Sequence, residues 1–570
     1  MHTIQPATVN EPSRDTPVWG EYDVVVLGGG PAGIAAAVAS ARLGRSTLLV
    51  ESYGFLGGMG TAAGVTNFCG LHANVHGRMR RVVHGVADEL LQRIDALGGL
   101  NEPHAIFGRT LAQAYDGAAY KCAADELLLT RGVQLLFHAQ AVGVQMRDDG
   151  SIDALLVETR SGRRALRAQV FIDCSGDGDL MHWAGAPWEQ GDAQGDLLYP
   201  TLMFRVAGVD DARAGEAWRE VGPRMAEAQR AGRHRFARQG AILRPMKHAG
   251  EWRVNVTQIA NAQGRAMDGT DALQLSAGEV EGRRQVREFF AFLRAEMPGF
   301  EQAYLLEIAP QVGIRETRRL LGRAVLTGAD VLGCADFDDS IGVNAWPLEQ
   351  HVAGDVKWSW PPADSRGYNQ LPWRMVLPQQ VRNLLVAGRC ASMDAAAQSA
   401  ARVSGACFVM GEAAGLGAAL DWRPGAAPPR KMPRCAVRCG TPYPAIASRS
   451  RRRSHRLRLR SAGRRRGPPA NWKEADDECH RTADRRHCRR AAQLHEDRTH
   501  PARAAGTAGR RQPLARAPGA HRAALRRTHV GRLLPPAGHP RPGRQPGGGL
   551  GHAGRADRRH HDALRTAAAA

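Results

Sequence analysis

The chain has 570 residues, with 77 Lys and Arg against 56 Asp and Glu, and a formal net charge of +21. Residues 1–422, the body, hold 41 basic and 47 acidic residues, net −6, whereas residues 423–570, the tail, hold 36 and 9, net +27. The charge therefore excludes the body from the basic proteins that bind nucleic acid or anionic membranes, and the body is long enough for two or three lobes.

Three further observations concern the cell compartment. The first 20 residues have no apolar h-region and no basic n-region, so we expect a flexible leader without a signal peptide. The six cysteines of the body show no disulfide or metal spacing, which favours a reducing, cytoplasmic environment and predicts no metal site. The apolar stretch 403–420 is interrupted by Ser404, Glu412 and glycines, so we interpret it as a buried helix and expect no membrane partner.

The body opens with a strand, a glycine turn, a helix and a second strand within about 30 residues. Tyr22–Leu27 is an almost continuous apolar run, typical of a central parallel strand. A small, Ala-rich helix is predicted for Ile34–Leu43, and Ser46–Val50 forms the second strand. The order predicts a Rossmann-like βαβ unit.

The turn itself, Gly28-Gly29-Gly30-Pro31-Ala32-Gly33, fits the pattern G-x-G-x-x-G. Gly28 permits the tight turn, Gly30 lets the backbone approach a pyrophosphate, and Gly33 lets the helix pack closely on the strand. The free N–H groups and positive dipole end of the helix favour a phosphate there. Glu51, at the end of the second strand, is placed to accept hydrogen bonds from a ribose. A glycine-rich loop without a ligand is the alternative.

Later elements follow from the same patterns. We predict a helix over 121–131 and a meander of strands at Val133–Phe137, Ala141–Gln145, Ile152–Glu158 and Ala168–Ile172. The middle block shows strand-like runs at Thr201–Val206 and Trp252–Gln258 and a helix near Ala277–Glu296. Asn383–Ala387 is a buried strand, and Ser404–Leu420 a helix of small residues.

Two later glycine motifs decide between NAD and FAD. Gly57-Gly58-Met59 could line the diphosphate and bring the chain toward a flavin. The strand 383–387 runs into Gly388 and Arg389, and the helix that follows carries Gly411 and Ala414, which gives a second grip on a long cofactor. The alternative for that helix is ordinary packing of small residues.

Several motifs in this order resemble the FAD-dependent oxidoreductase family, with a two-dinucleotide-binding-domain flavoprotein opening. The landmarks are YDVVVLGGGPAG at 22–33, VFIDCSGDGD at 170–179, APQVGIRETRRLLG at 309–322, LTGADV at 326–331, YNQLPWR at 368–374, NLLVAGR at 383–389 and the GEAAG helix. The resemblance covers residues 22–422. It implies a non-covalent FAD, with Asp173, Gly176 and Asp177 near the cofactor and Gly388, Arg389 and Arg402 near the flavin. Asp173 and Asp177 are alternatively turn-forming residues.

We therefore expect an α/β protein with a discontinuous Rossmann-like FAD-binding domain and an inserted α+β substrate lobe. The predicted parts are a leader (1–20), the FAD-binding domain (21–200 and 366–422), the lobe (201–365) and a low-complexity basic tail (423–570).

Three residues are candidates for work on the substrate. Arg315 could hold an anionic substrate as a planar fork, and Arg315 with Glu316 could equally be a structural ion pair between lobes. His351 could act as a general acid or base while hydride passes to or from flavin N5. The alternative for His351 is a solvated loop histidine.

The tail is expected to be disordered, because Ile, Leu, Val and Phe together make only about 8% of it. Our hypothesis for it is an out-of-frame translation. The body has 38 Arg and only 3 Lys, which suggests GC-rich coding DNA, and a shifted frame through such DNA gives mainly Arg, Ala, Pro, Gly and His, as found here. Translating the other two frames tests this.

The leading functional prediction is an FAD-dependent oxidoreductase that transfers a hydride between a small organic substrate and flavin N5. A non-catalytic electron-transfer flavoprotein is the alternative. A third interpretation is nucleic-acid binding through the tail, which also lacks aromatic stacking platforms. It is dropped from the main prediction because the charge of the tail is better evidence about the reading frame than about partners. The substrate, the electron acceptor and the oligomeric state do not follow from the sequence.

Overall fold

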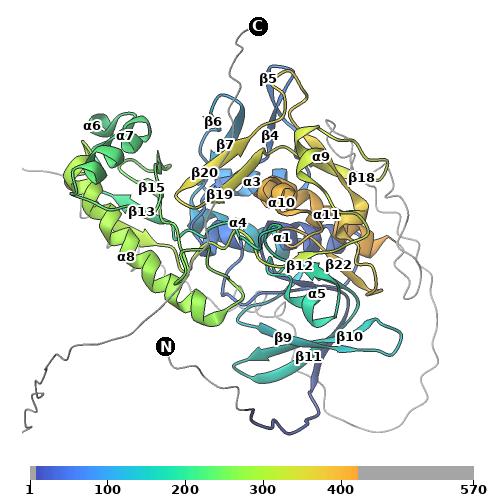
Figure 1. Ribbon diagram of the computed structural model, residues 1–570. Coiled ribbons are helices and arrows are strands. Elements are labelled where there is room, and N and C mark those ends of the chain that lie inside the picture. The colour runs from blue at the N-terminus through green and yellow to red at the C-terminus, as the bar shows by residue number, and fades with distance from the viewer. Residues whose placement is uncertain (1–7, 421–570) are drawn as a thin grey trace, which may run out of the picture. The chain divides into compact units, whose positions relative to one another are not determined.

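The computed structural model describes residues 8–420, so the predictions about the tail concern residues outside this range. The described part contains a seven-stranded sheet flanked by helices and a second, four-stranded sheet with helices of its own (Figure 1). This confirms the predicted α/β class with an inserted lobe. Among residues 8–420, no helix combines the length and the apolar character that a membrane span requires.

The larger sheet is built on five parallel strands in the order β8, β2, β1, β11, β22. Their bounds are β1 Val18–Leu27, β2 Thr47–Val50, β8 Gln134–Leu136, β11 Gly162–Asp173 and β22 Leu384–Val386. Strands β9 (Gln140–Met146) and β10 (Ile152–Thr159) continue the sheet in antiparallel pairing beside the first half of β11. Strand β1 comes from the start of the body and β22 from its end, so both ends of the body contribute strands to one sheet.

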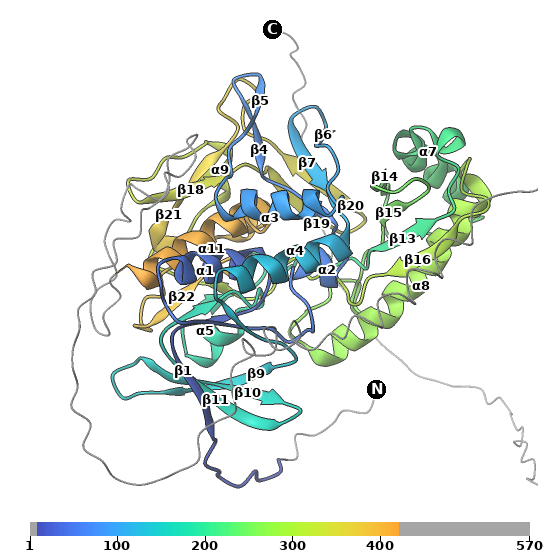
Figure 2. The same cartoon turned by 180° about the vertical axis from the view of Figure 1, so that it is seen from behind.

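Helices cover the two faces of this sheet, and the alternation of side chains along β1 divides its core between them. Val24 and Val26 pack into a cluster with α1 (Pro31–Arg42), α3 (Val86–Ala96), α4 (Gly117–Thr130) and α11 (Ser404–Ala419). Val25 and Leu27 pack on the opposite face with α5 (Asp179–Trp183). Figure 2 shows the four helices of the first cluster gathered together, with β9, β10 and β11 beyond them.

Helices α1 and α11 touch through their backbones because both consist mainly of small residues. A Cβ on Gly411 would lie 2.0 Å from the carbonyl oxygen of Ala32, and one on Gly415 would lie 2.1 Å from that of Ala36. Only glycine at these two positions permits the observed approach. The contact fixes α11 against the first turns of α1.

The lobe has a separate hydrophobic core that runs from Leu202 to Ile314. Its antiparallel sheet has the order β14–β15–β13–β16, with β13 Phe204–Ala207, β14 Ile242–Pro245, β15 Trp252–Asn255 and β16 Tyr304–Ile308. Its helices are α6 Asp211–Ala214, α7 Ala217–Arg230 and α8 Ala272–Glu296. The clustered buried residues between Leu326 and Leu377 pack into the core of the larger sheet and its helices, not into the core of the lobe. The predicted domain boundaries stay predictions.

The remaining elements are short and surround the larger sheet. They are α2 Met59–Ala62, β3 Asn67–Phe68, β4 His72–Val75, β5 Arg78–Arg81, β6 His104–Ile106, β7 Thr110–Ala114, β12 Trp188–Glu189, β17 Arg319–Leu320, α9 Gly328–Leu332, β18 Ser340–Asn344, β19 Leu348–Val352, β20 Asp355–Ser359, β21 Asn369–Pro372, the 3₁₀ helix η1 Trp373–Val376 and α10 Ala395–Ala401. The hairpin of β19 and β20 is the one that matters for the site.

Two expectations about the elements need correction. The strand predicted at 133–137 is β8, and it pairs parallel with β2 instead of joining the meander. Helix α8 begins at Ala272, five residues earlier than predicted, because the Asp271 side chain accepts the N–H groups of Leu273 and Gln274 and caps it.

Candidate functional site

A cavity of about 830 Å³ lies at the carboxyl ends of the parallel strands. Its wall includes residues that follow four of them: Gly28 after β1, Glu51 after β2, Cys174 after β11 and Gly388 after β22. Lobe residues on β14 and β15 line it as well. This edge is where open α/β sheets bind ligands, and the volume lies in the upper part of the range for ligand pockets.

The two glycine loops meet on this wall. Gly28 has a φ of +100°, and a Cβ there would lie 2.4 Å from the carbonyl oxygen of Cys174. Gly58 has a φ of +53°, and its Cβ would lie 2.8 Å from the Cα of Gly30. The N–H of Gly57 donates to the carbonyl oxygen of Gly29 at 2.8 Å. Two bare backbone segments therefore form one cradle.

Helix α1 begins at this cradle without a side-chain cap. Gly30 is its N-cap residue and offers no side-chain acceptor, and Pro31 and Ala32 line the cavity. The unpaired N–H groups of the first turn and the positive end of the helix dipole make this a favourable position for a phosphate.

Glu51 links the first glycine loop to the end of β2. One carboxylate oxygen accepts the N–H of Gly29 at 2.7 Å, and the other accepts the N–H of Tyr53 at 3.0 Å. The oxygen bound to Tyr53 also accepts the hydroxyl of Ser52 at 3.0 Å, so it is the oxygen bound to Gly29 that keeps acceptor capacity for a further hydrogen bond. Because Glu51 also lines the cavity, it is placed to accept a ribose hydroxyl.

Asp173, at the end of β11, is fully buried and serves the turn that follows. It accepts the N–H of Ser175 at 3.0 Å, its hydroxyl at 2.7 Å and the N–H of Met181 at 2.9 Å. Burial raises the pKa of this carboxyl, while these hydrogen bonds oppose the shift. The geometry matches the turn-forming alternative stated for Asp173.

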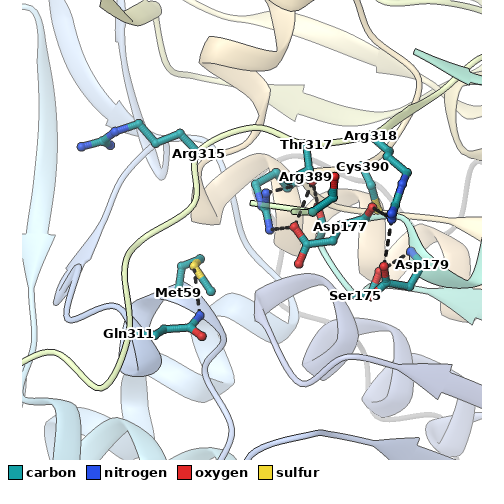
Figure 3. A network of polar contacts seen from close by, with 12 residues as sticks. Met59, Ser175, Asp177, Asp179, Gln311, Arg315, Thr317, Arg318, Arg389 and Cys390 are labelled. Atoms are coloured by element: carbon teal, nitrogen blue, oxygen red, sulfur yellow. Dashed lines mark hydrogen bonds and ion pairs between the residues drawn. The ribbon is translucent and has the colours of Figure 1, made fainter. Parts of the chain in front are cut away.

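Asp177, in contrast, faces the cavity within a polar network (Figure 3). Arg389 donates from Nη2 to its Oδ1 at 2.9 Å, and the hydroxyl of Thr317 donates to the same oxygen at 2.9 Å. A Cβ on Gly176 would lie 2.9 Å from that Arg389 nitrogen. The network joins the turn after β11 to the turn after β22.

His351 and Glu349 lie two residues apart on β19, so their side chains share one face of the strand. His351 is buried, and its Nε2 lies 3.0 Å from Oε1 of Glu349. The other Glu349 oxygen accepts the indole N–H of Trp346 at 2.8 Å. Glu349 lines the cavity, whereas His351 lies behind it.

The charges around this pair keep the carboxylate ionised. Burial opposes ionisation of Glu349, but the hydrogen bond from His351 and the positive charges of Arg402 and Arg315 outweigh it and lower its pKa to about 2. Burial, followed by the charge of Arg315, holds the pKa of His351 well below its usual range. A buried imidazole is thus paired with a buried carboxylate, so the solvated-loop alternative for His351 does not apply.

Arg315 and Glu316 point to different surroundings. Arg315 donates from Nε to the carbonyl oxygen of Tyr199 at 2.8 Å and from Nη2 to the hydroxyl of Thr201 at 2.6 Å, and it lines the cavity. Figure 3 shows its guanidinium directed away from the Asp177 network. Glu316 is buried and pairs with Arg319. The two neighbours therefore do not form the ion pair considered for them.

The structure brings most of the predicted site residues to one wall: Gly28, Gly30, Pro31, Ala32, Glu51, Gly58, Met59, Gly176, Asp177, Arg315, Gly388, Arg389 and Arg402. It does not place Gly33, Gly57, Asp173, Gly411, Ala414, Glu316 or His351 among the lining residues. A Cβ on Gly33 would lie 1.8 Å from the carbonyl oxygen of Gly28, as expected for close packing of helix on strand. Gly411 permits the contact between α1 and α11, which is the packing alternative stated for that helix.

Sequence reasoning missed several residues on this wall. Glu349 could have been found from its spacing of two from His351 on a predicted strand. Arg238, Arg253 and His104 carry no such signal, because they come from separate segments that only the tertiary structure brings to one cavity.

Comparison with known proteins gives one extended match. A family model described as FAD dependent oxidoreductase matches residues 23–439. Dihydrolipoyl dehydrogenase of Trypanosoma brucei brucei is 55% identical over 45 residues, which are 8% of this chain and 9% of that protein. Mitochondrial dihydrolipoyl dehydrogenase of Schizosaccharomyces pombe is 56% identical over 39 residues, 7% and 8% of the two chains. The chain thus spans less than a tenth of these curated relatives.

Solved structures resemble the chain more distantly. A geranylgeranyl bacteriochlorophyll reductase-like protein from Thermoplasma acidophilum is 15% identical, with a TM-score of 0.37 over 70% of this chain and 77% of that one. A p-nitrophenol 4-monooxygenase from Pseudomonas putida DLL-E4 is 14% identical, with a TM-score of 0.31 over 53% and 69%.

The residues around the cavity fit FAD, the cofactor in the description of the matching family. The cradle of Gly28, Gly30 and Gly58 has room only because side chains are missing, and it meets the uncapped start of α1, so it suits the diphosphate. Glu51 suits the adenosine ribose. The cavity continues past Met59 to the lobe, which leaves space for the rest of an extended cofactor.

Proposed function

Because the chain belongs to the FAD-dependent oxidoreductase family, we propose that this enzyme transfers a hydride between a small organic substrate and N5 of its flavin. Bound FAD supplies the reversible uptake of two electrons and a hydride that side chains lack. One observation carries the proposal. A single cavity runs from the glycine cradle to the lobe sheet, so cofactor and substrate would share one space.

The walls of that space support the substrate end of the proposal. Trp346, Trp358 and Tyr115 line it beside lobe residues such as Met203. Apolar and aromatic side chains on these parts of the wall displace water, which strengthens electrostatic interactions within the site. The lobe thus forms one wall of the cavity in which the substrate is proposed to react.

The pair of Glu349 and His351 is proposed to handle the proton that accompanies the hydride. In the direction of substrate oxidation, a C–H bond of the substrate breaks and its electron pair leaves with the hydride, while the substrate's O–H or N–H proton passes to a base. Glu349 is a carboxylate on the cavity wall that its surroundings keep ionised. His351 acts through it, as a positioning residue that holds the carboxylate by the 3.0 Å hydrogen bond.

The size and lining of the cavity favour an enzyme over an electron carrier. A carrier needs a flavin edge exposed to a protein partner, whereas a cavity of about 830 Å³ lined by two lobes suits a small molecule. The two functions differ in what reduces the flavin.

The test uses the purified full-length chain. Its absorbance spectrum reports whether FAD is bound, and anaerobic addition of a panel of alcohols, amines and organic acids reports whether a small donor bleaches the flavin. We expect bleaching by one class of donor, reversed by an artificial electron acceptor. A colourless protein that takes up no added FAD would refute the proposal, and flavin that is reduced only by a protein partner would favour the carrier.

A pair of variants makes the test specific to the site. Glu349→Gln should slow bleaching without releasing FAD, because the residue faces the substrate end of the cavity. Glu102→Gln, at an exposed position, is the matched control and should bleach like the wild type.

A further inference from the structure

Five arginines line the cavity at its lobe side: Arg238, Arg244, Arg253, Arg315 and Arg402, here called the arginine wall. Arg238 and Arg253 are each only 4% exposed. The hydrogen bonds of Arg238, Arg253, Arg315 and Arg402 go to neutral oxygens, namely backbone carbonyls, the Asn255 amide and the Thr201 hydroxyl. Arg244 stacks on Trp218. Within residues 8–420 none of the five forms a salt bridge.

Buried donors on this wall also lack partners. The Nε atoms of Arg253 and Arg402 and Nη1 of Arg244 are donors buried without a hydrogen bond. Nε2 of His104, which donates or accepts according to the tautomer, is buried without one as well. All four residues line the same cavity. Buried polar groups in folded proteins are almost always paired, and an unpaired charged donor is especially costly. The unpaired atoms therefore indicate an acceptor that the ligand brings.

The strand register concentrates this charge. Arg244 on β14 and Arg253 on β15 are directly opposite each other, so their side chains leave the sheet on the same face. Like charges in this arrangement repel, and burial makes the repulsion stronger because water screens it less. An anion between them would turn the repulsion into attraction.

The carboxylates that line the same cavity do not neutralise the positive charge of the arginine wall. Glu349 already accepts from His351 and Trp346, and Asp355 is the other carboxylate whose charge acts on Arg238. Asp177 belongs to Arg389, outside the wall. Burial lowers the pKa of Arg238 and of Arg253 to about 10, which leaves both charged at neutral pH. Of the carboxylates whose charges act on the five arginines, Glu349 and Asp355 line the cavity, whereas Glu216 and Glu316 lie outside its lining.

We propose that the arginine wall binds an oxyanion group of the substrate, a carboxylate or a phosphate ester, and that the substrate is an organic anion. This inference rests on the proposed function, because it names the class of the molecule that shares the cavity with FAD. A guanidinium presents Nε and Nη donors in a planar fork that matches two oxygens of such a group. In Arg253 and in Arg402 the unpaired Nε atom is one of the two donors of such a fork.

The experiment titrates the full-length, FAD-loaded protein with succinate, inorganic phosphate and uncharged succinamide, by calorimetry and by flavin difference spectra. We expect saturable binding of succinate or of phosphate and no binding of succinamide, and the two anions distinguish a carboxylate substrate from a phosphate ester. Arg253→Gln should weaken the binding at least tenfold. Arg283→Gln, an exposed arginine that pairs with Glu279, is the control and should bind like the wild type.

Several outcomes would overturn the inference. They are the absence of saturable binding by either anion, binding of succinamide as tight as that of succinate, or unchanged affinity in both Arg253→Gln and Arg238→Gln. The titration of the wild-type protein tests the inference by itself, so the inference remains testable even if one variant does not fold. FAD uptake is measured first, so a protein that holds FAD but binds no anion refutes this inference alone. Anion binding to a protein that takes up no FAD refutes the proposed function instead.

Discussion

Replacing Gly411 by alanine should loosen the contact between α1 and α11 and weaken FAD binding together. The new Cβ would lie 2.0 Å from the carbonyl oxygen of Ala32, where ordinary contact begins at 3.4 Å, so the overlap is about 1.4 Å. The obstacle is the backbone of another helix and cannot rotate away. Overpacking costs about 1–3 kcal/mol, and we expect the upper end, a loss of about 3 kcal/mol in the free energy of unfolding.

The affinity for FAD should fall because the displaced residue belongs to the cofactor cradle. Ala32 lies in the first turn of α1 and lines the cavity, so a helix pushed back by about an ångström no longer presents its N–H groups in place. A loss of about 1.4 kcal/mol in binding free energy is tenfold in the dissociation constant, and we expect at least that.

The assay compares urea unfolding of the FAD-free protein, followed by tryptophan fluorescence, with FAD titration of the folded protein. Gly117→Ala, at the first position of α4, is the matched control, because nothing lies within 4 Å of the added Cβ. Its stability should change by less than about 0.5 kcal/mol. If Gly411→Ala lowers FAD affinity but unfolds at the wild-type urea concentration, Gly411 contacts the cofactor directly and the packing argument is wrong.

Three further predictions follow from the site. Glu51→Gln should raise the FAD dissociation constant about tenfold or more, since its carboxylate holds the Gly29 loop at 2.7 Å; flavin fluorescence measures this, and an unchanged constant would contradict the role. Glu349 has a pKa lowered from 4.5 to about 2, so its ionisation stabilises the fold above pH 4.5, and this contribution, at most about 3 kcal/mol, is lost as the pH falls toward 2. Thermal melting between pH 5 and pH 2.5 should therefore show a shallower decline in Glu349→Gln than in the wild type, with exposed Glu102→Gln unchanged from wild type. His351→Gln, whose amide can still donate to Glu349, should keep turnover within about tenfold of wild type, whereas His351→Leu should lose more; equal loss with a shifted pH–rate profile would mean that His351 itself carries the proton.

The sequence was sufficient where structure depends on neighbours in the chain. The strand, glycine turn, helix and second strand between Tyr22 and Glu51 follow from local periodicity, and the structure places Gly28, Gly30 and Glu51 on the cavity wall. It was insufficient where a residue's role depends on a distant partner. The motif around Gly411 looked like a cofactor grip, but that residue faces α1, because helix packing depends on the crossing of two segments far apart in the chain.

The arginines of the lobe show why substrate residues escape sequence reasoning. Arg205, Arg253 and Arg244 lie opposite one another on three adjacent strands, and nothing in their local sequence separates them. Arg205 reaches carboxylates of Asp116, Glu251 and Glu307 at 3.7, 3.5 and 2.7 Å, and is thereby neutralised. Arg253 and Arg244, in the same row, face the cavity with unpaired donors. A row of like charges persists on one sheet face only if each member has an anionic partner. For Arg205 the fold supplies that partner, and for the other two we expect the substrate to do so.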